Sequence, residues 1–202
     1  MPIKINVPFD IRKNAKALGA WWFAEEKTWG IPDALTDINP FASWLPKEEG
    51  FIVKWPHIVL KSSRTCWKCH HETPLIALGA KSFYALEYVT ESDPRWTQWD
   101  YPVLFMDIDA MDEDLTTVLQ KKYPFFQFTY SKAAEKKYWA NTCTHCGSLQ
   151  GDNYNFLEYT GIFCFDEEER AISIKRDYLR MKFNYYIQSG FFQSESNAWI
   201  LK

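Results

Sequence analysis

Cys66-Trp67-Lys68-Cys69 and Cys143-Thr144-His145-Cys146-Gly147 are the two stretches of the sequence that decide the fold. Each contains a Cys-x-x-Cys turn, which lets two thiolates converge on one metal ion, and two such turns complete a closed tetrahedral site. Gly147 follows the second pair, where a knuckle needs a tight turn of the backbone. The spacing predicts one structural Zn²⁺ bound by Cys66, Cys69, Cys143 and Cys146, with a subdomain of 73 residues inserted between two zinc knuckles.

Three other interpretations compete for these residues. Cys66-Trp67-Lys68-Cys69-His70 fits the attachment pattern of a c-type haem, but such a haem needs an exported chain and a second axial ligand. A thioredoxin-like dithiol would explain one pair and leave the other without a role. His70, His71 or His145 could also replace a cysteine ligand, although we favour exposed histidines that lie beside the metal.

The number of cysteines and the lack of a targeting segment indicate a reducing compartment. Five cysteines are an odd number, which argues against a disulfide framework. Cys164 follows Ile162-Phe163 and precedes Phe165, so we expect a buried structural thiol. Residues 1–8 show no secretory signal, and no stretch approaches the roughly 18 apolar residues of a membrane span. We therefore expect a cytoplasmic protein without a membrane partner.

Composition excludes several classes of protein. With 202 residues, the chain has room for one domain, or for one domain plus a small module. It is 47% hydrophobic and 24% charged, which excludes a disordered, collagenous or coiled-coil chain. The net charge of -3 makes non-specific electrostatic binding to nucleic acid less favourable than binding to a protein.

The first 46 residues are predicted to form a compact unit. Residues 3–7 alternate between apolar and polar, which favours a short strand. Asp10 is a candidate N-cap for a helix that Gly19 would end. Two strands are expected around the polar turn at 24–27, and a short helical turn at 40–45.

The residues of this unit carry a resemblance to a known family. The unit resembles the small DUF5710 module, which recurs in bacterial proteins, including primase-like and topoisomerase-like proteins of mobile elements. The matching residues are Val7-Pro8-Phe9, Ala15-Lys16-Ala17-Leu18-Gly19-Ala20, Trp22, Lys27, Trp29, Pro32 and Phe41-Ala42-x-Trp44-Leu45-Pro46. In that family an arginine and an aspartate commonly flank the tryptophan after Gly-Ala, whereas Trp21 and Phe23 stand there in this chain.

A polar break at 47–50 predicts a boundary between a DUF5710-like module, residues 1–46, and a larger domain, residues 51–202. We expect the larger domain to be rich in short strands up to 108, with a loop at 91–95 and a helix at 111–122. A short helix at 131–137, a strand at 153–165 and a long helix at 167–187 complete the prediction. The expected fold class is α+β, with a small N-terminal ββ/α module and a mixed domain built around the four-cysteine site.

The larger domain is also similar to uncharacterised bacterial proteins that pair two cysteine motifs. Thr65-Cys66-Trp67-Lys68-Cys69 matches their "CWxC" knuckle, and Ala140-Asn141-x-Cys143 to Asp152 matches their "ANxCxxCGxxQGD" knuckle. This resemblance implies a shared split zinc site and brings no activity with it.

We find no sequence pattern of an enzyme. Four thiolates leave no open metal position for water, and the deaminase, P-loop, dinucleotide-binding and nucleophile-elbow motifs are absent. Asp107, Asp109, Asp112 and Asp114 form an acidic run without the glycine and glutamate of an EF-hand loop. This run is predicted to be the N-terminus of a helix, where carboxylates favour the positive end of the dipole.

The 36 aromatic residues exceed what we expect a core to need. Trp96, Trp99, Tyr101, Phe191 and Phe192 lie in polar surroundings and are candidate partner-binding residues. The favoured hypothesis is a non-enzymatic protein that binds another protein, such as an immunity protein that neutralises a bacterial toxin by covering its active site. The alternatives are a nucleic-acid-binding accessory protein of a mobile element and an enzyme with an unrecognised site.

Overall fold

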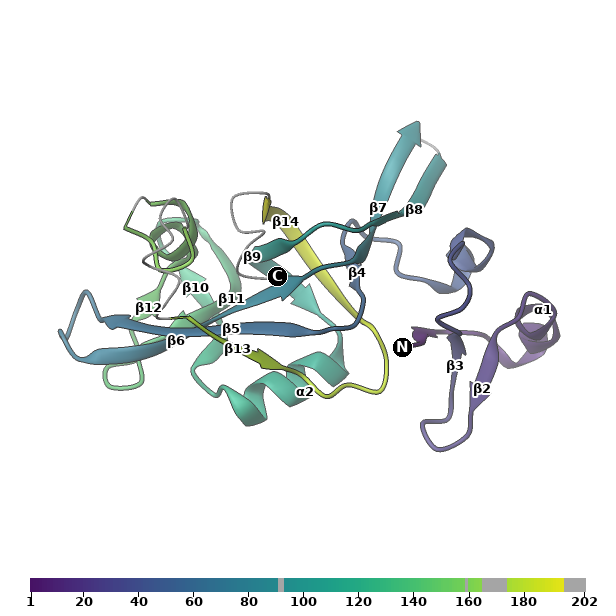
Figure 1. The fold of residues 1–202 in the computed structure, drawn as a ribbon, viewed down its shortest axis with the longest axis horizontal. Coiled ribbons are helices and arrows are strands. Elements are labelled where there is room, and N and C mark those ends of the chain that lie inside the picture. Colours follow the sequence, from purple (N-terminus) through teal and green to yellow (C-terminus); the bar gives the residue numbers. More distant parts are fainter. Residues whose placement is uncertain (91–92, 159, 165–173, 195–202) are drawn as a thin grey trace.

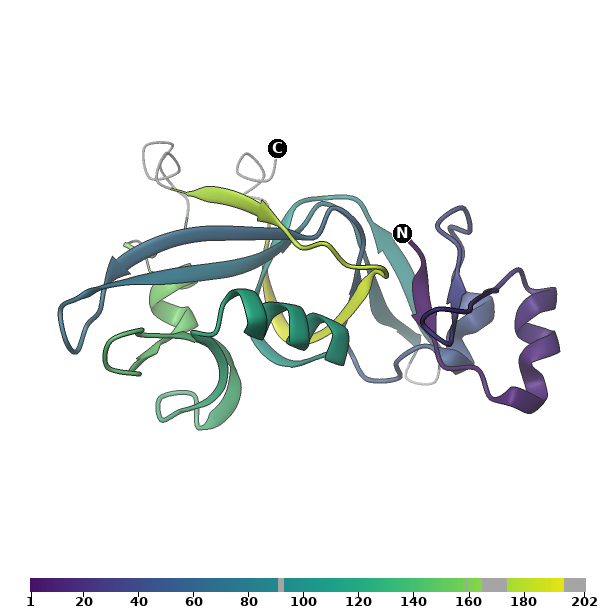
Figure 2. The same ribbon diagram turned by 90° about the horizontal axis from the view of Figure 1, so that it is seen from below.

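The computed structural model describes residues 1–90, 93–158, 160–164 and 174–194 of the chain. Figures 1 and 2 show the first 46 residues at one end of the molecule, while the longest hairpin reaches the other end. The described residues are mainly strands with few helices, so the expected α+β fold is strongly weighted toward β structure.

The N-terminal unit contains a three-stranded antiparallel sheet in the order β1-β3-β2. Its elements are β1 (Ile3–Ile5), a 3-10 turn η1 (Phe9–Ile11), α1 (Arg12–Ala17), β2 (Trp21–Phe23), β3 (Thr28–Ile31) and the 3-10 helix η2 (Asn39–Trp44). Gly19 ends the helical segment with a φ of 97°, which a residue with a side chain rarely adopts. The predicted cap is wrong, because Ile11 holds the N-cap of α1 and Asp10 lies inside the preceding 3-10 turn.

The larger sheet is antiparallel and follows the order β13-β5-β6-β9-β14-β4-β7-β8, with β11 also paired to β9, β10 and β12. Its strands are β4 (Phe51–Val53), β5 (Ile58–Thr65), β6 (Glu72–Ala80), β7 (Phe83–Thr90), β8 (Asp93–Trp99), β9 (Val103–Met111), β10 (Phe126–Ser131), β11 (Lys136–Thr142), β12 (Leu149–Gln150), β13 (Lys175–Tyr178) and β14 (Tyr185–Ser194). Helix α2 (Glu113–Lys122) buries Leu115 and Leu119 in the main core.

Four sequence expectations fail in this domain. In place of a helix at 167–187, the described residues form β13 and β14, because Tyr185, Ile187 and Ser189 are buried in alternation, with a period of two. In place of a strand at 153–165 there is a π-helix, η3 (Asn153–Leu157). In place of a helix at 131–137, the chain ends β10 at Ser131, turns over 132–135 and begins β11 at Lys136; Ser131 Oγ accepts a hydrogen bond from Ala134 N in this turn. The expected loop at 91–95 gives way to β8 from Asp93 onward.

The acidic run divides between two elements. Asp112 is the N-cap of α2, where its Oδ1 accepts from Leu115 N at 2.9 Å, and Asp114 lies in the first turn, as predicted. Asp107 and Asp109 lie earlier, on β9, and Asp109 pairs with Lys136 at 3.0 Å.

The N-terminal unit covers the edge strand β8. The side-chain amide of Asn39 accepts from Trp96 N at 2.8 Å and donates to Trp96 O at 3.0 Å, in the manner of a neighbouring strand. Tyr84 Oη donates to Thr36 O at 3.0 Å beside this contact. Trp96 is therefore only 3% exposed, so the expectation that it lies on a partner-binding surface is wrong. At Trp96, these bonds pair backbone groups that an edge strand would otherwise leave without partners.

We expect Asn39→Ala to lower the free energy of unfolding by about 1–3 kcal/mol, because it leaves the buried N–H and C=O of Trp96 without partners. Urea unfolding measures the loss, and amide exchange of β8 should quicken. Asn6→Ala is the matched control, since Asn6 is exposed. Equal stability of the two variants would contradict the assigned contact.

Candidate metal centre

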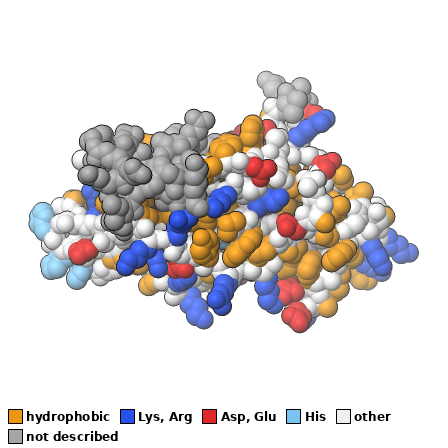
Figure 3. Space-filling view, in the orientation of Figure 1, with side chains coloured by type: hydrophobic (Ala, Val, Ile, Leu, Met, Phe, Trp, Pro, Cys, Tyr) orange, Lys and Arg blue, Asp and Glu red, His pale blue; other side chains and the backbone are white. Residues whose placement is uncertain are grey.

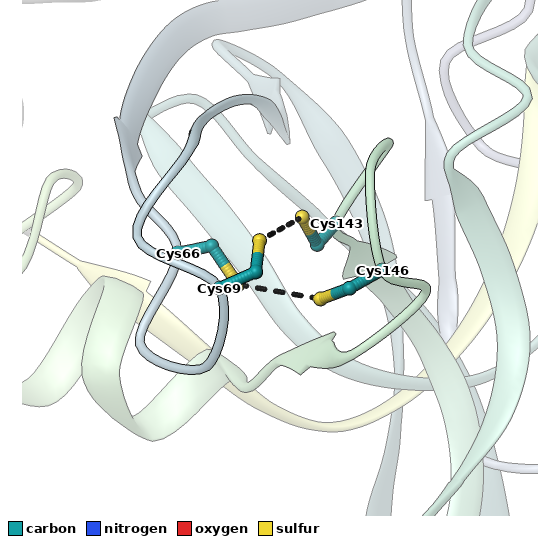
Figure 4. A group of neighbouring side chains, drawn as sticks. All are labelled: Cys66, Cys69, Cys143 and Cys146. Carbon is teal, nitrogen blue, oxygen red and sulfur yellow. Dashed lines mark hydrogen bonds between the residues drawn. The ribbon is translucent and has the colours of Figure 1, made fainter.

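Two loops bring the four predicted cysteines together. The loop between β5 and β6 carries Cys66 and Cys69, and the loop between β11 and β12 carries Cys143 and Cys146. All four sulfurs lie within 4.8 Å of one another and could hold a metal ion. The Sγ atoms of Cys66 and Cys146 are 3.7 Å apart, and those of Cys69 and Cys143 are 3.6 Å apart (Figure 4).

The two loops have the same backbone hydrogen bonds. In each loop the first cysteine donates its N–H to the carbonyl five residues later and accepts from the N–H four residues later. The pairs are Cys66 N to His71 O (2.8 Å), His70 N to Cys66 O (3.0 Å), Cys143 N to Ser148 O (2.8 Å) and Gly147 N to Cys143 O (2.9 Å). The residue after the second cysteine has a left-handed φ in both loops, 60° at His70 and 68° at Gly147. The sequence indicated this need at Gly147 only.

Polar contacts tie the second loop to the first. The Asn141 amide accepts from Ile76 N at 2.8 Å and donates to Ile76 O at 2.9 Å, which links β11 to β6. Thr73 Oγ1 accepts from Thr144 N at 3.1 Å, and Trp67 Nε1 donates to Leu149 O at 2.8 Å. These contacts hold the two cysteine pairs opposite each other, so the placement of the pairs does not depend on a metal ion alone.

The electrostatics of the cluster suit a bound cation. Desolvation opposes ionisation of Cys143, but backbone N–H groups of Cys146 and His145 outweigh it and lower the pKa of this thiol to about 6. The side chain and backbone of Ser148 lower the pKa of Cys146. A backbone bond with His71 also favours ionisation of Cys69, yet desolvation and the neighbouring thiols prevail and raise its pKa to about 12. Since adjacent thiolates repel one another, full ionisation of all four requires a compensating cation.

The fifth cysteine and the histidines lie outside the cluster. Cys164 is half-buried, so the expected fully buried thiol is not found. His71 and His145 stack on each other with ring centroids 4.6 Å apart and are not among the clustered groups. In the space-filling view, histidine side chains gather at the end of the molecule that carries the knuckles (Figure 3).

Asp152 is a residue near this site whose environment the sequence did not reveal. It is buried, and its Oδ2 accepts from Asp107 N at 2.8 Å. Burial raises the pKa of Asp152 to about 7, against the effect of that hydrogen bond. Asp107 itself has a left-handed φ of 51°, which is uncommon for a residue with a side chain.

A cleft of about 910 Å³ is lined in part by residues of both cysteine loops, among them Trp67, Lys68 and Ser148, and we refer to it as the knuckle cleft. Its walls come from the first knuckle, the turn between β10 and β11, β12 and η3. The aromatic lining residues are Trp67, Tyr130, Tyr138 and Tyr154, and the charged ones are Arg64, Lys68, Lys132 and Asp107.

The other candidate partner-binding residues do not form one described surface. Trp99 is 38% exposed, and its Nε1 donates to Glu87 Oε1 at 3.0 Å. Tyr101 is half-buried against Phe83, with ring centroids 5.4 Å apart. Phe191 and Phe192 belong to the backbone of β14, and their side chains lie outside the described part of the structure. The N-terminal unit instead exposes large apolar side chains that we had not singled out for binding, namely Phe9, Leu18, Trp21 and Trp22.

Comparison with known proteins identifies the N-terminal unit alone. Residues 3–46 match the family described as "Domain of unknown function (DUF5710)", which confirms that resemblance. No curated protein and no solved structure matches the chain. Within the described residues, no helix has both the length and the apolar character to cross a membrane.

The shared knuckle geometry makes a prediction about Gly147. Gly147→Ala should lower the free energy of unfolding by about 1 kcal/mol, because the added Cβ meets no atom within 4 Å and the cost is the left-handed φ alone. In the His70→Gly variant, relief of the same backbone strain stabilises the folded state, while glycine raises the conformational entropy of the unfolded state. The two effects oppose each other, so the free energy of unfolding should change little. Thermal unfolding of both variants checks this, and an unaffected Gly147→Ala protein would contradict it.

Asp152 predicts a pH dependence of stability. Its pKa is higher in the folded chain than the ordinary value of about 4, so the folded state binds the extra proton and loses stability as the pH rises from about 4 to 7. Asp152→Asn should remove this loss, and its free energy of unfolding at pH 8 should exceed that of the wild type by at most about 4 kcal/mol. Burial of His57 lowers its pKa to about 4 and gives the opposite slope in both proteins. Only the difference between their urea-unfolding profiles is therefore informative, and identical profiles would contradict the prediction.

Proposed function

We propose that the four cysteines bind one structural Zn²⁺. A tetrahedral site with Zn–S bonds of about 2.3 Å has sulfur–sulfur edges of about 3.8 Å. The two sulfur–sulfur distances, 3.7 and 3.6 Å, agree with such edges. They are much longer than a disulfide bond of about 2.05 Å. Four soft thiolate ligands favour zinc and fill every position of its tetrahedron, which supports a structural role.

Metal analysis tests this proposal. We expect one zinc ion per chain, and chelation should unfold the larger domain because binding energy at such a site is folding energy. Cys143→Ser should behave as a folding variant with lost zinc, whereas Cys164→Ser should keep the metal. A wild-type protein that stays folded without metal would overturn the proposal.

We further propose that the protein is not an enzyme and acts by binding another protein. The observation that carries this is the pair Trp21 and Trp22 on β2, an edge strand of the small sheet, with exposed fractions of 64% and 51%. Tryptophan is enriched among the residues that dominate binding energy, and consecutive residues of a strand present these two rings on opposite faces of the edge.

The departure from the family pattern supports the same proposal. Phe23, where the family commonly has aspartate, contacts Phe183 edge-on with ring centroids 5.2 Å apart, so it attaches the N-terminal unit to the larger domain. Trp21, where the family commonly has arginine, remains at the surface. Phe23 therefore stabilises the fold, whereas Trp21 is available to bind a partner.

The net charge of -3 favours a partner with a basic surface, since opposite charges speed association and suppress wrong partners. A bacterial toxin whose active site is covered by this protein is the partner that we favour within this class. The proposed mechanism is steric and needs no catalytic residue.

A comparative pull-down from the source cell tests protein binding. We expect the wild-type chain to enrich one specific protein, and the double variant Trp21→Ser/Trp22→Ser to lose it. Phe128→Ser is the matched control, because Phe128 is 48% exposed and lies on β10, outside the N-terminal unit. Enrichment of nucleic acid alone, or equal capture by the double variant, would overturn the proposal.

A further inference from the structure

We propose that the knuckle cleft binds single-stranded nucleic acid, at a surface separate from the proposed protein-binding site. The cleft combines exposed aromatic rings with cations that form no ion pair within the described residues, and none of these side chains is among the four clustered cysteines. It holds a few nucleotides at most, given its volume of about 910 Å³.

The rings come from three different segments. Trp67 lies in the first knuckle, Tyr130 at the end of β10 and Tyr154 in η3, and each exposes more than half of its side chain. Trp67 is fixed by its hydrogen bond to Leu149 O, so its ring is held at the surface. Such rings suit bases, because every base presents a π-face on which an aromatic side chain can stack.

The charges of the cleft are mostly positive. Lys68 and Lys132 are exposed and form no ion pair with any residue in the described ranges, and Arg64 adds a third cation. Arg64 is anchored, since its guanidinium donates to Asn155 Oδ1 at 3.0 Å. Asp107 is the only carboxylate among the described lining residues. Three cations against one carboxylate create a local site for phosphates on a chain whose net charge is -3.

A single strand fits this arrangement better than a duplex. Stacked and paired bases of a duplex show only their edges, whereas a single strand offers base faces and backbone phosphates together. We also prefer nucleic acid to an acidic peptide, since a peptide would use the cations and leave three exposed rings without matching planar groups.

The test is fluorescence anisotropy with a labelled 12-nucleotide single-stranded DNA, and an RNA of the same sequence, on the full metal-bound chain. Binding should weaken with salt, with a slope of log K against log salt of roughly -2 for three phosphate contacts. Tyr154→Ala should weaken binding about tenfold. The double variant Lys68→Ala/Lys132→Ala should reduce the magnitude of the slope by about 1.4.

Matched variants keep the result unambiguous. Tyr178→Ala, an exposed tyrosine on β13, and Lys121→Ala, on α2, lie outside the cleft and should bind like the wild type. Trp21→Ser/Trp22→Ser should also keep full oligonucleotide affinity, which separates this inference from the proposed protein binding. Metal content is checked for every variant. Absent binding at 50 mM salt, equal affinity for the duplex, equal competition by polyglutamate or an unaffected Tyr154→Ala protein would overturn the inference.

Discussion

The convergence of two cysteine pairs is the constraint on which the larger domain depends. Residues so far apart in the sequence can meet only if the intervening chain returns to the same place. The strand order provides this return, since β5, β6, β9 and β11 are successive neighbours and both cysteine loops lie at the same end of them. Asn141 then fixes β11 to the backbone of β6, so that the sulfurs face one another. A bound metal ion would stabilise a geometry that these hydrogen bonds already define.

A second contact decides how the two parts of the chain combine. Asn39 presents its amide to β8 as a neighbouring strand would, and Trp96 is buried in a core that joins residues of both parts. The side chain of Asn184 adds a further link by donating to Met1 O at 2.7 Å. The N-terminal unit therefore also protects the larger domain, because it covers part of a sheet edge that could otherwise pair with another chain.

The sequence predicted what depends on local spacing and missed what depends on distant neighbours. The two cysteine pairs, the turn at Gly147, the acidic N-terminus of α2 and the strands of the N-terminal unit each follow from a few adjacent residues. The burial of Trp96 did not, because the residue that covers it, Asn39, is 57 positions away. Residues 175–187 combine helix-forming residues with a buried alternation that only the pairing of β14 with β9 reveals. The knuckle cleft escaped prediction for the same reason, since Arg64, Lys132 and Tyr154 come from separate segments.

The position of the proposed metal site relative to the two proposed surfaces has a mechanistic consequence. Trp67 and Lys68 lie between the ligands Cys66 and Cys69, and Leu149 and Gln150 closely follow Cys146, so the walls of the knuckle cleft are built from the metal loops themselves. Trp21 and Trp22 belong to a sheet whose buried residues include none of the cysteines. Loss of the proposed metal should therefore disrupt the cleft directly, whereas it reaches Trp21 and Trp22 only through the core that the two parts of the chain share. Two surfaces at opposite ends of one chain can respond differently to the metal, because only one of them is built on its ligands.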